Sequence, residues 1–236
     1  MKNPSFYSNT GIYHIYNRGV EKRDIFLEDA DYWRFIHDLY EFNDADSIGN
    51  TYRRATQLFE VEPRTIGRQH QQHQRELLVE IFAFCLMKNH YHLLVRQRKE
   101  NGIPIFMQKL GTGYTMYFNE KNDRVGSLLQ GRYKAVQVDD DAHFLWMPTY
   151  IHFNPLDYYV PEWREQEIRD PRKALAFLMQ YRWSSFSDYM GVRNIPSVTS
   201  REFLLKCFGG HEAYKQDTIK LLQSMKMEKI SHLTLE

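Results

Sequence analysis

The chain is poor in cysteine and has no long hydrophobic run. Only Cys85 and Cys207 occur among its 236 residues, with no CxxC pair, so neither a disulfide framework nor a thiolate zinc site is encoded. The longest apolar run, IFAFCLM at 81–87, is too short to cross a bilayer, and the first residues lack the apolar centre of a signal peptide. We therefore expect a protein of a bacterial-type cytoplasm or of a nucleus, without a membrane partner.

The chain also has little net charge. Its formal charge of +1 does not indicate a nucleic-acid binder, and its 42% hydrophobic and 26% charged residues are ordinary for a soluble globular protein. Aromatic residues, in contrast, make up 15% of the sequence. Such residues can stack on unpaired bases or fill a core, and composition alone leaves both interpretations open.

The hydrophobic periodicity predicts a mixed fold. Strands are expected at 11–19, 77–87, 90–96 and 131–138, with a tight turn at 88–89, and helices at 28–42, 103–122 and 139–154. The order strand, helix, strand, strand, helix, strand is a split βαβ pattern. It predicts an α+β fold in which helices pack on a ferredoxin-like antiparallel sheet.

Two regions lie outside this pattern. The core, 1–160, is expected to contain a polar loop insertion at about 43–76, and 161–236 to form a C-terminal helical extension rather than a second catalytic domain. A Gln-rich tract in the insertion is a poor metal cage for its two histidines. The arginines of the insertion either contact DNA or have no function. These residues are His70, His73, Arg53, Arg54, Arg64 and Arg68.

Two histidines stand one residue apart in the strand at 90–96. Side chains alternate along a strand, so His90 and His92 share one face, about 7 Å apart, while Tyr91 points to the other. Two imidazoles at this spacing can bind one cation. They can equally be histidines accommodated on the wetter face of a sheet, and the triplet alone leaves both interpretations open.

A second polar pair lies at the end of the last core helix. Tyr150 and Asn154 are four residues apart and so share a helix face, where the phenol is a candidate nucleophile and the amide a candidate oxygen ligand. A packing tyrosine and a helix-end asparagine are the ordinary alternatives. Pro155 is expected to end the helix at Asn154. Pro148 is expected to remove a backbone hydrogen bond to Phe144 and to bend the helix.

Taken in order, five motifs resemble one family. YHIYNRG (13–19), HYH (90–92), QGRYK (130–134), YIHFNP (150–155) and RWSSF (182–186) are similar to those of the single-tyrosine HUH transposases, especially the REP-associated tyrosine transposases of bacteria. The resemblance covers roughly residues 10–190. It implies a nucleoid-associated enzyme that cleaves single-stranded or hairpin DNA, REP-like palindromes among the candidates, through a 5′-phosphotyrosine intermediate.

The resemblance also assigns roles. It implies that Tyr150 attacks the phosphodiester while His90, His92 and Asn154 bind a divalent metal, Mg²⁺ or Mn²⁺. Two imidazoles are softer ligands than Mg²⁺ prefers, so we expect weak metal binding without DNA.

Several basic residues are candidates for DNA contacts. Arg132 and Lys134 are expected to alternate onto one strand face and contact phosphates, with Arg18 as the next candidate. Tyr114 and Tyr117 are rival nucleophiles, but neither is followed four residues later by a carboxamide, so packing is favoured for them.

The leading hypothesis is a transposase-like, metal-dependent DNA endonuclease and strand transferase, either monomeric or a homodimer. The alternative is a catalytically silent, domesticated protein that only binds single-stranded or hairpin DNA. A different metal hydrolase or metal-binding protein is a third hypothesis, weakened because the sequence lacks an ExxH or CxxC that would supply a third strong ligand.

Overall fold

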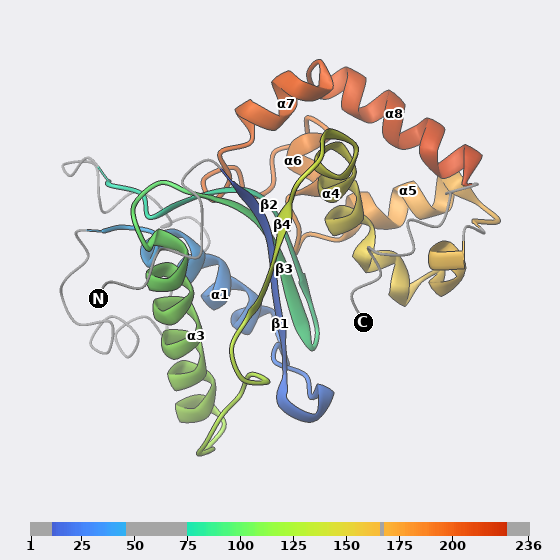
Figure 1. Cartoon of the computed structure of the whole chain (residues 1–236). Helices are drawn as coiled ribbons and strands as arrows, with labels where there is room; N and C mark the ends of the chain where they lie inside the picture. Colours follow the sequence, from blue (N-terminus) through green and yellow to red (C-terminus); the bar gives the residue numbers. More distant parts are fainter. Residues whose placement is uncertain (1–10, 46–74, 166–167, 226–236) are drawn as a thin grey trace.

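Four strands form one antiparallel sheet in the computed structural model, which describes residues 11–45, 75–165 and 168–225. The spatial order is β2-β3-β1-β4 (Figure 1). In chain order, helix α1 stands between β1 and the β2–β3 hairpin, and α3 stands between that hairpin and β4, which is the ferredoxin-like arrangement. The predicted fold class is therefore confirmed. The elements are β1 (Ile12–Arg18), α1 (Asp29–Glu41), β2 (Val79–Met87), β3 (His90–Gln97), α3 (Gly102–Lys121) and β4 (Lys134–Val138).

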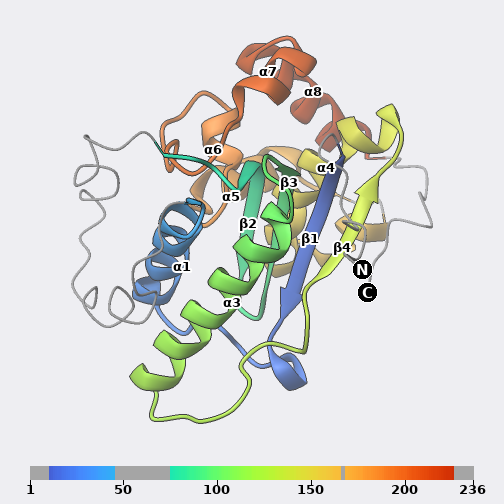
Figure 2. The same ribbon diagram turned by 60° about the vertical axis from the view of Figure 1, so that its left-hand side comes forward.

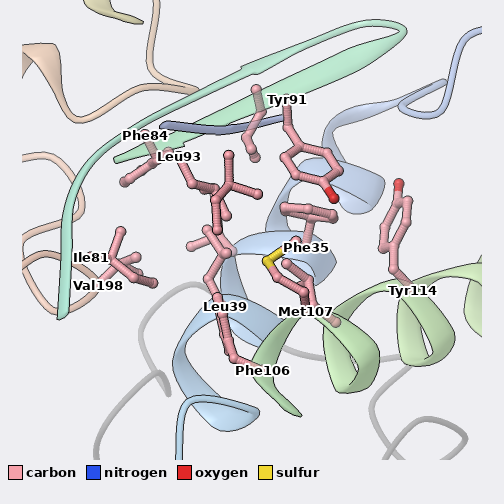
Figure 3. Packing of buried hydrophobic residues seen from close by; sticks show 14 of the residues in the cluster. Phe35, Leu39, Ile81, Phe84, Tyr91, Leu93, Phe106, Met107, Tyr114 and Val198 are labelled. Carbon is pink, nitrogen blue, oxygen red and sulfur yellow. The ribbon is translucent and has the colours of Figure 1, made fainter. Parts of the chain in front are cut away.

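Helices α1 and α3 cover one face of the sheet (Figure 2). Helix α1 begins where the Glu28 side chain accepts from the backbone of Asp31 and the Asp31 side chain accepts in return, a capping box that satisfies two free N–H groups. The two helices and the sheet enclose a core rich in aromatic rings. Figure 3 shows part of this core: Phe35 and Leu39 of α1, Tyr91 and Leu93 of β3, and Phe106, Met107 and Tyr114 of α3.

The other face of the sheet is covered by α4 and the C-terminal helices (Figure 1). Strand β2 is thus buried on both faces, which explains its continuous apolar sequence. The elements on this side are α4 (Asp141–Phe153), η2 (Asn154–Tyr158), η3 (Pro161–Glu165), α5 (Pro171–Gln180), α6 (Phe186–Tyr189), α7 (Glu202–Phe208) and α8 (His211–Ser224); the short η1 (Val20–Lys22) follows β1.

The RWSSF segment lies along the free edge of β2. Leu86 N donates to Trp183 O at 2.9 Å, and Ser185 N donates to Phe84 O at 3.0 Å. These bonds occupy backbone groups that an exposed edge would leave free to pair with another chain. Residues beyond 160 therefore pack against the sheet, while the expected domain boundary near 160 stays a prediction.

Helix α4 is held from behind by a buried histidine. His152 is 0% exposed; its Nδ1 lies 2.7 Å from the hydroxyl of Tyr214 in α8, and its Nε2 lies 2.7 Å from Ser185 Oγ. Ser185 Oγ also accepts from Phe84 N of β2 at 3.0 Å. Because both imidazole nitrogens are bonded, α4 is fixed between the sheet and the C-terminal helices.

Three expectations about local structure have different outcomes. The helix containing Pro148 continues to Phe153 and has Asn154 as its C-cap, so its end was predicted correctly. The strand expected over 131–138 was predicted too long, because β4 begins only at Lys134. Most of the expected insertion, residues 46–74 with His70, His73 and the four arginines, lies outside the described residues.

None of the described helices is both long and apolar enough to span a membrane.

Two glycines of α3 provide a test of its packing against α1. A Cβ at Gly111 would make an ordinary contact with Leu129 Cδ1 at 3.8 Å, whereas a Cβ at Gly113 would lie 2.5 Å from Phe42 Cε2. We expect Gly111→Ala to raise the free energy of unfolding by about 1 kcal/mol, because alanine favours helix. We expect Gly113→Ala to lower it by about 1–3 kcal/mol through overpacking. Urea denaturation measures both, and stabilisation by both variants would contradict the close approach at Gly113.

His152 is expected to make the fold sensitive to acid. Burial lowers the pKa of His152 from 6.5 to about 3. The unfolded chain therefore binds this proton at higher pH, so the contribution of His152 to stability is complete above about pH 6.5 and is lost as the pH falls toward 3. Below pH 6 we expect the free energy of unfolding of wild type to fall more steeply than that of His152→Gln, by up to about 1.4 kcal/mol per pH unit. Urea denaturation from pH 4 to 8 measures the two slopes, and equal slopes would contradict the assignment.

Candidate active site

The two histidines of the HYH motif lie on the face of the sheet that α4 covers, called the α4 face below and defined by Tyr16, His90 and His92. The imidazole centroids of His90 and His92 are 5.0 Å apart and their planes are perpendicular. His90 Nδ1 lies 2.6 Å from Asn89 Oδ1, and Asn89 Nδ2 donates to Lys22 O at 3.2 Å. Because a carboxamide oxygen can only accept, His90 carries its proton on Nδ1, and its Nε2 has a free lone pair.

A third histidine, His14 of β1, joins this pair. His14 Nε2 lies 2.9 Å from His92 Nδ1, and the two rings are stacked with centroids 5.1 Å apart. Sequence reasoning missed His14. Its signal was its alternation with Tyr16 in β1, but the pairing of Tyr16 with His92 that brings it here depends on the register of two strands far apart in the chain.

All three imidazoles are neutral. Burial lowers the pKa of His14 to about 3 and that of His90 to about 4. It also lowers the pKa of His92 well below its ordinary value, and a proton on His90 or His14 would lower it further by repulsion. The guanidinium of Arg164 contributes in the same direction at His90 and His92. A neutral imidazole is the form that can bind a metal.

Tyr150 of α4 faces these histidines. Its ring meets His92 edge to face at a centroid distance of 5.9 Å and His14 at 5.8 Å. The side chain is largely buried, with 8% of its surface exposed. Helix α4 therefore brings the expected nucleophile over the face that His90 and His92 share, although Pro148 lies two residues before it.

Asn154 lies one turn beyond Tyr150 and is fully buried. Its Nδ2 donates to the backbone oxygen of Tyr150 at 2.8 Å, and its Oδ1 accepts from Arg164 Nη2 at 3.2 Å. The oxygen expected to bind a metal is thus engaged by a guanidinium through one of its two lone pairs.

Arg164 and Asp157, which sequence reasoning missed, complete this side of the site. Arg164 Nε and Nη2 donate to the two carboxylate oxygens of Asp157 at 2.9 and 2.8 Å, a bidentate ion pair. Arg164 Cζ lies 5.9 Å from the ring centroid of Tyr150. Both residues belong to short 3₁₀ helices, which have no hydrophobic periodicity that sequence reasoning could use.

Two of the three expected DNA contacts lie on the α4 face. Arg18 pairs with His90 across β1 and β3, and Lys134 pairs with Tyr16 across β1 and β4, with its Nζ 5.6 Å from the Tyr16 ring centroid.

The third, Arg132, was placed wrongly. It precedes β4 and lines a cavity of about 550 Å³ beside α3, on the other side of the sheet, with Gln108 and Thr112. Arg132 and Lys134 therefore do not share a strand face, because the strand begins two residues after Arg132.

The two rival tyrosines, Tyr114 and Tyr117, lie away from the histidines and hydrogen-bond to other groups. The Tyr114 hydroxyl donates to Ile25 O, and the Tyr117 hydroxyl donates to Asp31 Oδ1 at 3.0 Å. Both rings belong to the core between α1, α3 and the sheet. A different phenol, that of Tyr16, lies on the α4 face; its ring stacks on His14 at 5.2 Å and it is half-buried.

The side chains that the structure describes do not by themselves form a complete metal cage. Within residues 11–45, 75–165 and 168–225, no group of three or more His, Cys, Asp or Glu side chains is arranged to hold a metal ion. The donors present are two neutral imidazoles on β3 and one carboxamide oxygen beyond α4.

Part of the chain matches the model of a known protein family. The model of the family described as "Transposase IS200 like" matches residues 50–154. Among solved structures, the chain is similar to the "Structure of the REP associates tyrosine transposase bound to a REP hairpin", with 10% sequence identity, a TM-score of 0.44, and coverage of 83% of this chain and 89% of that chain. The curated proteins gave no match. The resemblance indicated by the ordered motifs is thus confirmed over residues 50–154, where the chain matches the IS200-like transposases.

Proposed function

We propose that the protein is a transposase-like endonuclease and strand transferase that cleaves single-stranded or hairpin DNA with Tyr150 as its nucleophile. The observation that carries the proposal is the edge-to-face contact of the Tyr150 ring with His92, whose ring centroids are 5.9 Å apart, on the face of the sheet that also holds His90. The match of residues 50–154 to IS200-like transposases supports a DNA-cleaving reaction.

The reaction exchanges one phosphodiester for another. Tyr150 Oη forms a bond to the scissile phosphorus, the bond from phosphorus to the 3′-oxygen breaks, and the phenolic proton balances the free 3′-hydroxyl. The product is a 5′-phosphotyrosine. Because the energy of the broken bond is kept in the new one, the 3′-hydroxyl of another strand can reverse the step without a high-energy cofactor.

The surroundings of Tyr150 hold the nucleophile in place. The rings of His14 and His92, nearly perpendicular to the Tyr150 ring, limit its rotation. The bond from Asn154 Nδ2 to the backbone oxygen of Tyr150 fixes the last turn of α4. A nucleophile held in one orientation loses little entropy when it reacts.

His90, His92 and Asn154 are the residues that would hold a divalent cation, Mg²⁺ or Mn²⁺. The donor chemistry fits: Asn89 leaves His90 Nε2 unprotonated, and donation from His92 Nδ1 to His14 would do the same for His92 Nε2. Asn154 Oδ1 keeps a second lone pair beside its bond from Arg164. When bound, such a cation supplies Lewis-acid polarisation of the scissile phosphate.

The basic residues on the α4 face would guide the strand to Tyr150. Arg18 lies beside His90, and Lys134 lies beside the half-buried Tyr16 ring. Cations attract the phosphates, and an aromatic ring can stack on an unpaired base. Arg132, on the other side of the sheet, would contact a different part of the same DNA.

Replacing the nucleophile is expected to abolish covalent attachment. We expect wild type, incubated with Mn²⁺ and a labelled hairpin with single-stranded arms, to form a protein–DNA adduct that survives denaturing electrophoresis. Tyr150→Phe removes only the hydroxyl, so it should form no detectable adduct. Tyr159→Phe, at an exposed tyrosine (42% exposed), is the matched control and should equal wild type.

An adduct that persists in Tyr150→Phe would move the nucleophile to another residue, with the Tyr16 phenol as the first to examine. Binding of several hairpins without any adduct, in both metals, would instead support the silent DNA-binding alternative.

Removal of the metal and substitution of its proposed ligands are both expected to impair formation of the protein–DNA adduct. A chelator should abolish the adduct, and Mn²⁺ should support it at lower concentration than Mg²⁺, because imidazole is a soft ligand for Mg²⁺. His90→Ala and His92→Ala should each raise the metal concentration for half-maximal adduct formation by about 10-fold or more. His211→Ala, at an exposed histidine at the start of α8, is the control. An unchanged metal dependence in both variants would exclude the HYH motif as the ligand pair.

A further inference from the structure

We propose that Arg164 is a substrate-contacting residue of this site, whose guanidinium donates to a non-bridging oxygen of the scissile phosphate while Asp157 holds it in position. The inference rests on the proposed function and adds to it a residue from outside the matched segment 50–154.

The orientation of Arg164 is set before any substrate arrives. Asp157 accepts from its Nε and Nη2, and also from Trp163 Nε1 at 2.6 Å, so the carboxylate itself is fixed. The guanidinium also lies against the Trp163 ring, 4.9 Å from its centroid. A bidentate, stacked arginine loses little freedom when it binds a further anion.

The guanidinium lies between the two halves of the site. Its Nη2 reaches Asn154 Oδ1 at 3.2 Å, and its Cζ is 5.9 Å from the ring centroid of Tyr150. Its charge also acts on His90 and His92, whose pKa values it helps to lower. In the proposed reaction, the Tyr150 hydroxyl and a cation held by His90 and His92 would act on one phosphate. A hydrogen-bond donor close to these three side chains therefore lies close to that phosphate.

The local charges favour an anion. Asp157 neutralises one positive charge, while Arg164, Arg18 and Lys134 all lie on or beside the α4 face. The Arg164 side chain keeps 23% of its surface exposed. Three hydrogen bonds from Nε and Nη2 hold the guanidinium to Asp157 and Asn154, and it is also in hydrogen-bonding range of the Tyr150 phenol. A guanidinium has five N–H donors, so it has donors beyond the three bonds to Asp157 and Asn154 that a phosphate oxygen could accept from.

A purely structural ion pair is the competing explanation. In that case Arg164 would only fix η2 and η3 to the end of α4, and loss of either partner would have the same consequence. The two explanations predict different reaction rates for Arg164→Gln at saturating DNA. They also predict different losses of DNA-binding affinity when the scissile phosphate is made neutral.

The first experiment measures single-turnover adduct formation by the full chain with Mn²⁺ and saturating hairpin DNA. We expect Arg164→Gln to slow the reaction by about 100-fold, as loss of a donor to developing charge does. Arg164→Lys should slow it by about 10-fold, because a point charge cannot reproduce the fork. Arg172→Gln, at an exposed arginine of α5, is the control and should equal wild type. A rate within threefold of wild type for Arg164→Gln, or for Arg164→Lys if the Gln variant does not fold, would overturn the proposal.

The second experiment tests contact with the phosphate. The linkage cut by wild type is replaced by a neutral methylphosphonate, and DNA binding is measured in the non-reacting Tyr150→Phe background. We expect the replacement to weaken binding about 10-fold when Arg164 is present and no more than about twofold in the Tyr150→Phe/Arg164→Gln protein. Equal losses in both proteins would show that Arg164 does not contact this phosphate.

The proposed function and this inference fail in different ways. If wild type forms no adduct with any hairpin, Tyr150 chemistry is wrong, and this role for Arg164 is wrong with it. If wild type forms the adduct and the Arg164 variants match it, only the role of Arg164 is wrong.

Discussion

The fixed position of α4 is the constraint on which the site depends. His152 uses both ring nitrogens to join α4 to Ser185 at the edge of β2 and to Tyr214 in α8. These bonds are made in a fully buried place, where an unpaired polar group would be costly. The same helix carries Tyr150 two residues earlier, on the side that faces the sheet. The C-terminal helices therefore act on the candidate site by fixing the helix that brings the phenol to the histidines.

Burial also sets the chemical state of the site. The layers that cover both faces of the sheet remove His14, His90 and His92 from water, and desolvation keeps all three imidazoles neutral. Neutral imidazoles can serve as ligands, but they contribute no positive charge toward DNA. That charge has to come from residues at the margin of the site, and Arg18, Lys134 and Arg164 lie there. The burial that stabilises the fold thus leaves neutral imidazoles inside the candidate site and positively charged side chains at its margin.

The sequence predicted what depends on local periodicity and failed where distant segments meet. Element order, the shared face of His90 and His92, and the end of α4 at Asn154 follow from alternation, helical spacing and Pro155. His14 was missed because its contact with His92 depends on the register of β1 against β3. Arg132 was misplaced because β4 begins later than its pattern suggests.

Asn154 connects Tyr150, the proposed nucleophile, to the rest of the candidate site. Its Nδ2 is committed to the backbone oxygen of Tyr150, one turn back, and this bond directs Oδ1 away from the helix toward Arg164. One short amide therefore fixes both the position of the Tyr150 backbone and the direction of a candidate metal ligand. The Tyr150 backbone and the oxygen beside the expected phosphate cannot move independently, because both are held by the same planar group. This coupling gives a physical reason for a carboxamide four residues after the tyrosine, where a carboxylate would accept from Arg164 but could not donate to the carbonyl.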